Sequence, residues 1–318
     1  MKNIYLNIYK PNLINLKKAK KNLYNNNIIG LPTETVYGLA GNAYSNKSVK
    51  KIFKLKKRPA FNPLIIHFKN KEELRKDVIL NDNFFKLYKF FCPGPITFVL
   101  KKKENSKISN IATVGKNTVA VRIPKLKIAR NLLNILNFPL AAPSANIASK
   151  LSPTSAKDVA EEFGKKIKFI LDGGRCKIGL ESTIIDLTNK PTLLRPGSIT
   201  IEKIKKVLKK KIKIKKNKKK INAPGQLKLH YSPGIPVKMN KKYAEKGQAL
   251  IGLGRKFKDG KNRFNLSKNG NLKEAANNLY TIMRKIKKQK FKSIAVTKMP
   301  NVGIGFAIND RLRKASSK

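Results

Sequence analysis

The sequence predicts a mixed α/β fold in which a twisted sheet carries helices, followed by a smaller parallel α/β domain. Three observations lead to this prediction. Before residue 209, short apolar runs rich in β-branched residues outnumber the helix-like segments and are not strictly interleaved with them, which argues against a regularly alternating parallel sheet. A lysine-rich run, Lys209–Lys220, then interrupts the chain. After it, strand-like and helix-like segments alternate, as in a small parallel sheet.

The expected helices before residue 209 combine apolar positions at helical spacing with a recognisable start or stop. Between residues 48 and 57, for example, Val49 and Ile52 recur at helical spacing. Pro59 then ends the segment, because proline cannot continue a helix. The expected helices are 17–23, 48–57, 83–91, 156–163 and 199–208.

The expected strands before residue 209 are short apolar runs bounded by turn residues. Residues 28–31 run into Pro32, and residues 169–171 end at Asp172-Gly173-Gly174. Because β-branched residues are frequent in these runs, a pleated and buried conformation fits them. The expected strands are 28–31, 64–68, 96–100, 119–123, 169–171, 183–187 and 192–194, and residues 139–142 lead into a polar turn.

The lysine-rich run is expected to begin an interdomain linker over residues 209–233, since a dense run of like charge repels itself and stays extended. Turns at Ala223-Pro224-Gly225 and Ser232-Pro233-Gly234 continue it. The predicted domains are therefore 1–208 and 234–318. In the second domain we expect strands at 248–253 and 292–297 and helices at 272–286 and 304–314.

The composition is strongly basic: 72 Lys and Arg against 17 Asp and Glu give a net charge of +55 over 318 residues. This excludes an acidic disordered chain, and the glycine content excludes a collagen-like one. The charge has two interpretations. One is a polyanionic partner, either RNA or a phosphate-rich ligand. The other is compositional drift, since the lysines spread along the whole chain. Charge alone does not decide the function.

Two cysteines, Cys92 and Cys176, are too few to cross-link a chain of this length, and a reducing compartment fits them. No run approaches the roughly 18 apolar residues of a membrane span, so no membrane partner is expected. The first residues lack the apolar stretch of a signal peptide. The expected location is the cytoplasm.

Familiar metal and phosphate motifs are absent or incomplete. There is no HExxH motif and no CxxC pair, and His67 and His230 lie far apart, so no metal site built from the protein is expected. Residues 41–48 have the spacing of a phosphate-binding loop, but Asn46 replaces its second glycine. Gly252-Leu253-Gly254 lacks the third glycine of a dinucleotide fingerprint. We interpret both as coincidences.

Unusual turns remain, each combining small hydroxyl residues with proline or glycine at the end or start of an apolar run. Such turns display backbone N–H groups and hydroxyls, which suit an anionic ligand. One such turn alone is usually an ordinary connection, but five in one domain indicate a shared site. They are residues 31–39, 93–97, 142–146, 179–183 and 194–198.

These motifs resemble the threonylcarbamoyl-AMP synthase family, the YrdC/Sua5 family, and specifically its longer Sua5 type. The resemblance extends in the right order over nearly the whole chain. It implies a YrdC-like mixed sheet and a small Rossmann-like C-terminal Sua5 domain. The matching stretches are LPTETVYGLAGNA, KLKKRPAFNPLIIHF, PGPITFVL, VAVRIP, APSANIASKLSPT, GLESTIID, LLRPGS, APGQLKLHYSP and GIGFAINDRLRKA.

The resemblance implies that L-threonine, bicarbonate and ATP are combined into threonylcarbamoyl-AMP and pyrophosphate. It also implies Mg²⁺ held through the ATP phosphates, with no protein ligand. A separate transferase then modifies adenosine 37 of tRNAs that read ANN codons, and direct contact with tRNA is a further expectation. Attack of threonylcarbamate on the α-phosphate is mainly a problem of positioning and charge neutralisation, which fits the absence of a nucleophile triad.

The same resemblance assigns roles to individual residues. Lys57 stands where the family has glycine, and it is expected to add a charge beside the phosphates. Residues 222–233 are expected to fold over the pocket, with Tyr231 excluding water from the nucleotide. The catalytic positions are Lys56 and Arg58. The ATP-binding positions are Arg58, Asn62, Thr118, Ser144, Ser152, Arg195 and Tyr231. The threonine-binding positions are Thr35, His67, Arg122, Ala142 and Ser182.

An alternative from another class is an RNA-binding protein on the same fold, because a basic sheet could hold a duplex backbone. Pyrophosphate release that requires threonine, bicarbonate and ATP would support only the enzyme. A third interpretation is a carbamoyl-adenylate domain of the hydrogenase-maturation type. The absence of a CxxC pair and of an acylphosphatase-like segment argues against it.

Overall fold

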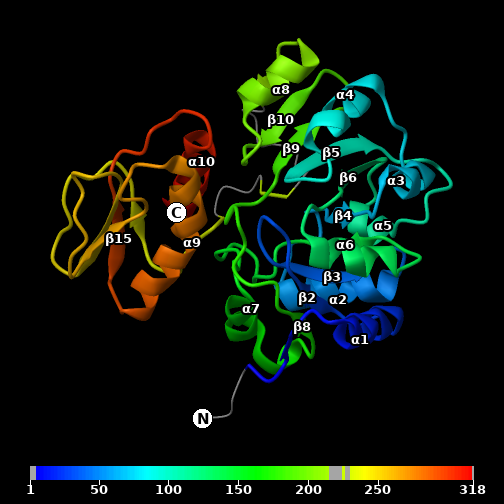
Figure 1. Cartoon of the computed structure of the whole chain (residues 1–318), viewed down its shortest axis with the longest axis horizontal. Helices are drawn as coiled ribbons and strands as arrows, with labels where there is room; N and C mark the ends of the chain where they lie inside the picture. The colour runs from blue at the N-terminus through cyan, green and yellow to red at the C-terminus, as the bar shows by residue number, and fades with distance from the viewer. Residues whose placement is uncertain (1–4, 215–223, 226–229, 317–318) are drawn as a thin grey trace.

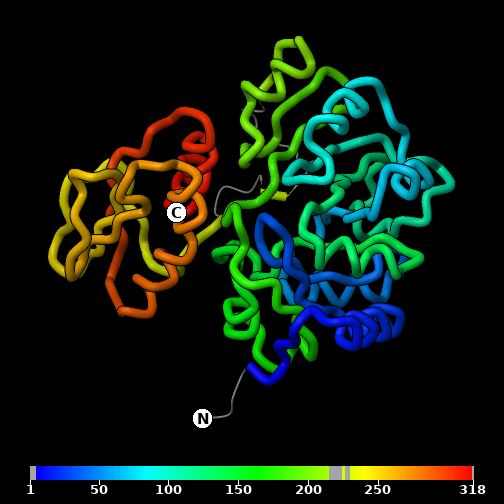
Figure 2. The backbone as a smooth tube through the Cα atoms, viewed as in Figure 1, coloured from blue at the N-terminus to red at the C-terminus, as the bar shows by residue number. Residues whose placement is uncertain are grey.

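The computed structural model describes residues 5–214, 224–225 and 230–316. They form a large domain followed by a small one beside it, and the larger begins with the blue N-terminal segment in Figure 1. The backbone tube in Figure 2 shows that the two domains are joined near the middle of the molecule. Within the described residues, no helix is both long and apolar enough to cross a membrane.

Within the described residues, the large domain is built on an eleven-stranded mixed sheet with the order β1-β8-β2-β3-β7-β4-β6-β5-β9-β10-β11. In its centre, β4 runs parallel to β6, β6 runs antiparallel to β5, and β5 runs parallel to β9. The predicted mixed sheet is confirmed. The strands are β1 Ile8–Tyr9, β2 Ile29–Leu31, β3 Gly38–Asn42, β4 Ile65–His67, β5 Ile96–Lys101, β6 Thr118–Arg122, β7 Leu140–Ala141, β8 Ile170–Leu171, β9 Thr183–Asp186, β10 Thr192–Arg195 and β11 Lys213–Ile214.

Helices pack around this sheet, and most begin at a residue whose side chain caps the first turn. Asn81 Oδ1 accepts the Phe84 N–H at the start of α4, and Ser155 forms a capping box with Asp158 at the start of α7. The helices are α1 Leu13–Tyr24, α2 Asn46–Lys56, α3 Lys71–Asp77, α4 Asp82–Phe91, α5 Asn110–Thr113, α6 Lys127–Asn134, α7 Ala156–Phe163, the 3₁₀ turn η1 Gly164–Lys166 and α8 Ile201–Leu208.

The central strands present two different faces, because successive side chains of a strand alternate. One face contributes large apolar residues, among them Ile66, Phe98 and Val121, to the main core. The other face carries polar residues such as His67 and Arg122. It also carries a separate small apolar cluster of Ile65, Val99, Ala120, Ile184 and Leu194. This second face is the one that forms the candidate site.

The small domain is a four-stranded, all-parallel sheet with the order β12-β15-β13-β14. Its helices α9 and α10 lie on the side that faces the large domain (Figure 1). The predicted small parallel α/β domain is confirmed. Its elements are β12 Val237–Lys238, β13 Gln248–Gly252, β14 Arg263–Asn265, α9 Leu272–Lys288, β15 Ser293–Val296 and α10 Gly305–Ser316.

The domain boundary differs from the predicted one at residue 208. Strand β11 pairs with β10, so the sheet of the large domain extends to Ile214. The remainder of the predicted linker includes residues 215–223 and 226–229, which lie outside the described residues.

The segment 41–48, which has the spacing of a phosphate-binding loop, is instead a packed connection from β3 to α2. A Cβ atom at Gly41 would lie 2.4 Å from Ser48 Oγ and 2.8 Å from Ile28 Cδ1. Ser45 caps the helix by accepting the Ser48 N–H. The loop therefore encloses its own side chains, which agrees with the interpretation as a coincidence.

Candidate active site

A pocket with about 510 Å³ of empty space lies on the polar face of the central strands. Four of the five unusual turns contribute to its wall. The fifth, residues 93–97, supports the wall, since Thr97 Oγ1 lies 2.7 Å from Ser182 Oγ. The predicted residues that line the pocket are Thr35, Arg58, His67, Arg122, Ala142, Ser144, Ser182, Arg195 and Tyr231.

Arg122, at the end of β6, is held by the segment 33–36. Its Nη1 donates to Thr35 Oγ1 at 2.9 Å, and its Nη2 donates to Glu34 Oε1 at 2.6 Å. The other carboxylate oxygen of Glu34 accepts the N–H groups of Lys125 and Leu126. Arg122 Nε has no partner among the described residues. The guanidinium is therefore fixed in place and keeps a donor for an anionic ligand.

His67, at the end of β4, lies beside Arg122 in the strand register. Its side chain is buried, and neither ring nitrogen has a partner among the described residues. Burial, together with the charge of Arg122, lowers the pKa of His67 to about 3. The ring is therefore neutral at physiological pH, with one donor and one acceptor open to a ligand.

Arg58 follows α2 and points into the pocket from a short, well-bonded loop. Its Nε donates to Asn62 O at 2.8 Å, and its Nη2 donates to Asn62 Oδ1 at 2.7 Å and to Pro63 O at 2.8 Å. Burial, and next the charge of Arg195, lower the pKa of Arg58 to about 9. Arg58 therefore stays charged at neutral pH. Asn62 does not line the pocket itself, and it holds the Arg58 guanidinium in position.

Arg195, at the end of β10, is the second guanidinium on this side of the pocket. Its Nε donates to Ser182 O at 3.0 Å, and its Nη2 donates to Ser182 Oγ at 3.1 Å. Burial lowers its pKa as well. Arg58 and Arg195 thus bring two positive charges to this side of the pocket, which suits an anion with several oxygens.

Lys56 does not line the pocket itself, because its ammonium binds to the turn at residues 144–146, which contributes to the wall. It donates to the carbonyl oxygens of Ser144 and Asn146, at 2.5 and 2.6 Å. Burial, reinforced by the charge of Arg58, lowers the pKa of Lys56 well below its ordinary value. In this structure Lys56 anchors the 144–146 turn, and its direct contact with phosphate or carbonate stays a prediction.

The expectation that Lys57 adds a charge beside the phosphates is corrected by the structure. Lys57 is the residue that ends α2, and its φ of 49° lies in the left-handed region. This conformation, which glycine adopts most easily, turns the Lys57 side chain into a separate hollow beside α2. Lys57 thus keeps the left-handed backbone conformation typical of glycine, and its charged side chain lies outside the catalytic pocket.

Glu181 is a site residue that the sequence interpretation missed. It lines the pocket and accepts hydrogen bonds from Ser152, from Tyr280 of α9 and from Arg311 of α10. Burial alone would raise its pKa, but Arg311, Arg195 and the Ser152 hydroxyl hold the pKa of Glu181 at about 2. Ser152 is thus placed behind the pocket wall, where it orients Glu181.

The linker residues that the structure describes cover the pocket. Pro224, His230 and Tyr231 contribute to its wall, and the Tyr231 ring is almost fully buried. The Arg311 guanidinium lies 5.0 Å from the centre of that ring, a cation–π contact. Gly225, with φ of 82°, leaves no room for a Cβ, which would lie 2.7 Å from the Tyr231 hydroxyl oxygen.

Thr118 does not line the catalytic pocket. It begins β6, four residues before Arg122 and hence about 13 Å from it. It borders a different hollow with Lys101 and Lys102. Its side chain nevertheless lies on the same face as Ala120 and Arg122, because residues two apart share a face.

The two domains that form this site match two known protein families. A family model described as "Telomere recombination", which covers Sua5, YciO and YrdC proteins, matches residues 21–197. A second, described as "Threonylcarbamoyl-AMP synthase, C-terminal domain", matches residues 199–317. The chain belongs to the Sua5/YrdC family of threonylcarbamoyl-AMP synthases. Its two-domain architecture is that of Sua5, and it has the enzymatic character of the family.

The related Sua5 proteins match over most of their length. The threonylcarbamoyl-AMP synthase of Pyrococcus abyssi is 40% identical over 91% of this chain and 90% of the relative. That of Bacillus subtilis is 35% identical over 95% and 92%. The crystal structure of P. abyssi Sua5 complexed with L-threonine superimposes with a TM-score of 0.89, at 37% identity, over 97% of this chain and 96% of the other.

The acid stability of this Sua5-type chain should depend on its two buried histidines. Burial lowers the pKa of both His67 and His230 to about 3, so the unfolded state takes up protons first as the pH falls. The free energy of unfolding should therefore decrease by up to about 2.7 kcal/mol per pH unit between roughly pH 5.5 and 4. Urea titrations at several pH values measure this slope. His67→Gln and His230→Gln should each remove about half of it, and unchanged slopes would contradict the assignment.

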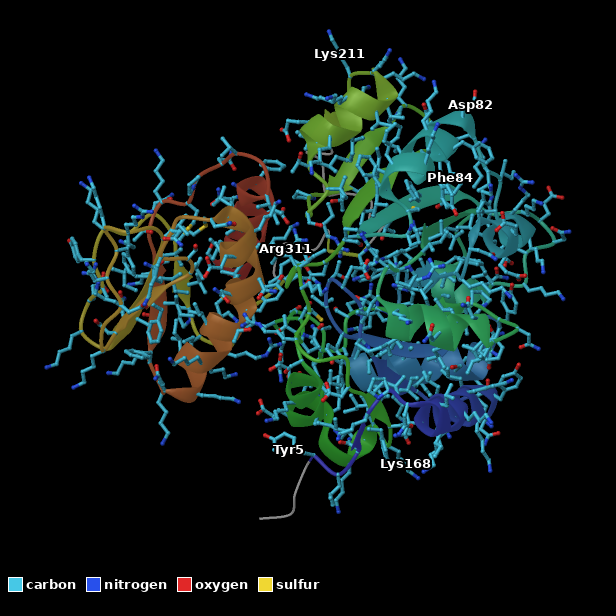
Figure 3. The ribbon with its side chains drawn as sticks, viewed as in Figure 1. Tyr5, Asp82, Phe84, Lys168, Lys211 and Arg311 are labelled. Carbon is cyan, nitrogen blue, oxygen red and sulfur yellow. The ribbon has the colours of Figure 1, made fainter. Side chains whose placement is uncertain are left out.

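Arg311 should couple the two domains through Glu181. The residue is buried between the domains, as Figure 3 shows. Arg311→Met leaves the Glu181 carboxylate with its two hydroxyl donors alone, which should cost about 3 kcal/mol of stability. Thermal unfolding measures the loss. Lys273→Met, which removes an exposed cation from α9 of the same domain, is the matched control. Equal melting temperatures for both variants would contradict the coupling.

Proposed function

We propose that the pocket combines L-threonine, bicarbonate and ATP into threonylcarbamoyl-AMP and pyrophosphate. The observation that carries this proposal is that one pocket holds two groups without a partner among the described residues, His67 and Arg122 Nε, and two further cations, Arg58 and Arg195. The first pair suits a small amino acid, and the second suits a polyphosphate. Membership of the Sua5/YrdC family supports the same reaction.

The threonine-binding site is proposed at the ends of β4 and β6. The carboxylate of threonine would meet the free donor of Arg122, and its hydroxyl or amine would meet the neutral ring of His67. Thr35 and Ser182 place hydroxyl groups in the same wall, and Ala142 contributes its backbone groups to that wall. The crystal structure of P. abyssi Sua5 complexed with L-threonine supports this binding position.

The ATP-binding site is proposed along the neighbouring strands. Arg58 and Arg195 would bind the phosphates as charge-assisted donors, and Ser144 would add a contact from its turn. The small apolar cluster on the same face, Ile65, Val99, Ala120, Ile184 and Leu194, offers a surface for the purine. Thr118 lies just beyond Ala120 on that face, which fits a role at the distal end of the nucleotide.

The proposed chemistry needs orientation more than a protein nucleophile. The threonine amine attacks bicarbonate to form a carbamate and water. A carbamate oxygen then forms a bond to the α-phosphorus while the bond from that phosphorus to the pyrophosphate oxygen breaks. Fixed guanidinium groups neutralise the charge that develops on the departing pyrophosphate. Tyr231 and Pro224 would limit the access of water, which would otherwise hydrolyse the acyl-adenylate.

Mg²⁺ is proposed to enter with ATP. The two carboxylates near the pocket already have partners: Glu34 binds Arg122, and Glu181 binds Arg311. Since Mg²⁺ commonly binds through substrate phosphates, this donor set fits an ion held by ATP. We expect excess EDTA to reduce pyrophosphate release to background and added Mg²⁺ to restore it. Full activity with EDTA present would contradict the proposal.

The product is proposed to pass to a separate transferase that modifies tRNAs reading ANN codons. The alternative, an RNA-binding protein on this fold, explains the net positive charge. It gives no role to the buried polar groups around His67 and Glu181. Incubation with labelled bicarbonate tests the synthesis directly. Label should enter an adenylate only when threonine and ATP are both present. Tight RNA binding without label incorporation would favour the alternative.

A further inference from the structure

A second hollow lies beside α2 and shares no lining residue with the catalytic pocket. It is formed by the exposed side of α2, the turn at Ile147, the end of α7 and the chain that follows it. Its empty volume of about 1140 Å³ exceeds the 510 Å³ of the catalytic pocket. Lys168, labelled in Figure 3, marks its place near the lower edge of the large domain.

The hollow combines an apolar floor with a basic rim. Its apolar lining residues are Ile28, Leu55, Ile147 and Phe163. Its cationic lining residues are Lys51, Lys54, Lys57, Lys166 and Lys168. The lysines of this chain are abundant everywhere, but here they surround an apolar depression, which a uniformly solvated surface does not require.

The charges of the rim are largely uncompensated. Glu162 is the one carboxylate in the lining, and it already accepts the Ile147 N–H at 3.1 Å and pairs with Lys150 at 3.2 Å. Lys51 donates to Asn27 at 3.2 Å. The side chains of the other four rim lysines have no hydrogen-bond or ion-pair partner in the part of the chain that the structure describes. An anion would therefore find donors that are not committed elsewhere.

We propose that this hollow binds a small organic phosphate with a flat apolar body, of the class of nucleoside monophosphates. The apolar floor would take the flat body, and the lysine ammonium groups would take the phosphate as point charges. Inorganic phosphate alone would leave the floor exposed, and a nucleoside alone would leave the lysines unpaired. Both parts of the ligand are thus required for tight binding.

This site uses Lys57, the residue that departs from the family's glycine. The Lys57 side chain projects into the hollow, while its neighbours Lys56 and Arg58 serve the catalytic side. Ile147 similarly follows Asn146, whose carbonyl binds the Lys56 ammonium. The hollow and the catalytic pocket therefore lie on opposite sides of shared segments and hold different ligands.

The sequence contains no tryptophan, so one introduced tryptophan reports on the hollow alone. Leu55→Trp places the indole in its wall, and Phe163→Trp provides a second reporter should the first unfold. AMP is titrated against each full-length reporter, with adenosine and inorganic phosphate as separate probes. We expect saturable quenching by AMP and much weaker responses to either part.

Charge reversal supplies the decisive comparison. Lys54→Glu with Lys168→Glu should weaken AMP binding at the reporter by about tenfold or more, because two charge-assisted contacts are lost. Lys50→Glu with Lys165→Glu changes the net charge equally, uses exposed lysines of the same region outside the hollow, and should change binding less than about twofold. Equal effects of both pairs, no saturable AMP response in either folded reporter, or binding of poly-L-glutamate in place of AMP would overturn the proposal.

Discussion

Arg58→Ala should reduce pyrophosphate release by about 10²–10³-fold while the protein stays folded. The guanidinium is a preorganised donor at the point where charge develops on the leaving pyrophosphate, and such donors contribute about 3–4 kcal/mol to the transition state. Its three hydrogen bonds to residues 62 and 63 hold it there before substrate binds. Initial rates with saturating threonine, bicarbonate and ATP measure the loss.

Two variants separate the role of Arg58 from a general effect of charge. Lys50→Ala removes an exposed cation from the preceding helix and should retain wild-type rates. Arg58→Lys keeps the charge but cannot reproduce the planar contact with Asn62 and Pro63, so it should stay strongly impaired. A rate within about threefold of wild type for Arg58→Ala would remove the residue from the reaction.

Arg122→Met should abolish threonine-dependent turnover and also destabilise the fold by about 3–5 kcal/mol. It removes the free Nε donor, and it leaves Glu34 as a buried carboxylate that has lost its cation. Chemical unfolding measures the stability, and pyrophosphate release measures the activity.

The partner substitution distinguishes these two losses. Glu34→Gln combined with Arg122→Met removes the unpaired charge, so it should recover most of the lost stability and none of the activity. Recovery of activity in the double variant would show that Arg122 acts only through the fold. Failure to recover stability would show that the ion pair is not the cause of the destabilisation.

Much of the fold could be predicted from local patterns. The apolar runs at Ile65–His67 and Ile96–Lys101 are rich in β-branched residues, and both are strands. Gly38–Asn42 was missed as a strand because it contains glycine, alanine and asparagine and no β-branched residue. Its conformation comes from pairing with β2 and β7 on either side, which is a tertiary effect.

The site residues were predicted position by position from the family resemblance, and Glu181 was missed because its role depends on packing between distant segments. His67 and Arg122 meet because β4 and β6 pair in register. Glu181 could have been suspected, since acidic residues are rare in this chain and it adjoins Ser182. Its bonds to Tyr280 and Arg311 join residues 99 and 130 positions apart, which no local pattern indicates.

The second domain also gains a structural role that its sequence alone does not reveal. Helices α9 and α10 supply Tyr280 and Arg311 to a carboxylate that lines the catalytic pocket. Because Arg311 also lies over the Tyr231 ring, the same side chain contacts the residue that covers the pocket. The small domain thus fixes the wall of the site from behind.

Pyrophosphate release by the purified full-length chain tests the central claim most directly. The reaction is run with Mg²⁺ and ATP, first complete and then without threonine or without bicarbonate. Release should require both, since the carbamate that attacks the α-phosphate is made from them, and Arg58→Ala should reduce it by about 10²–10³-fold in the complete mixture. Release that continues without threonine, or that is unaffected by Arg58→Ala, would contradict the assignment of this pocket to threonylcarbamoyl-AMP synthesis.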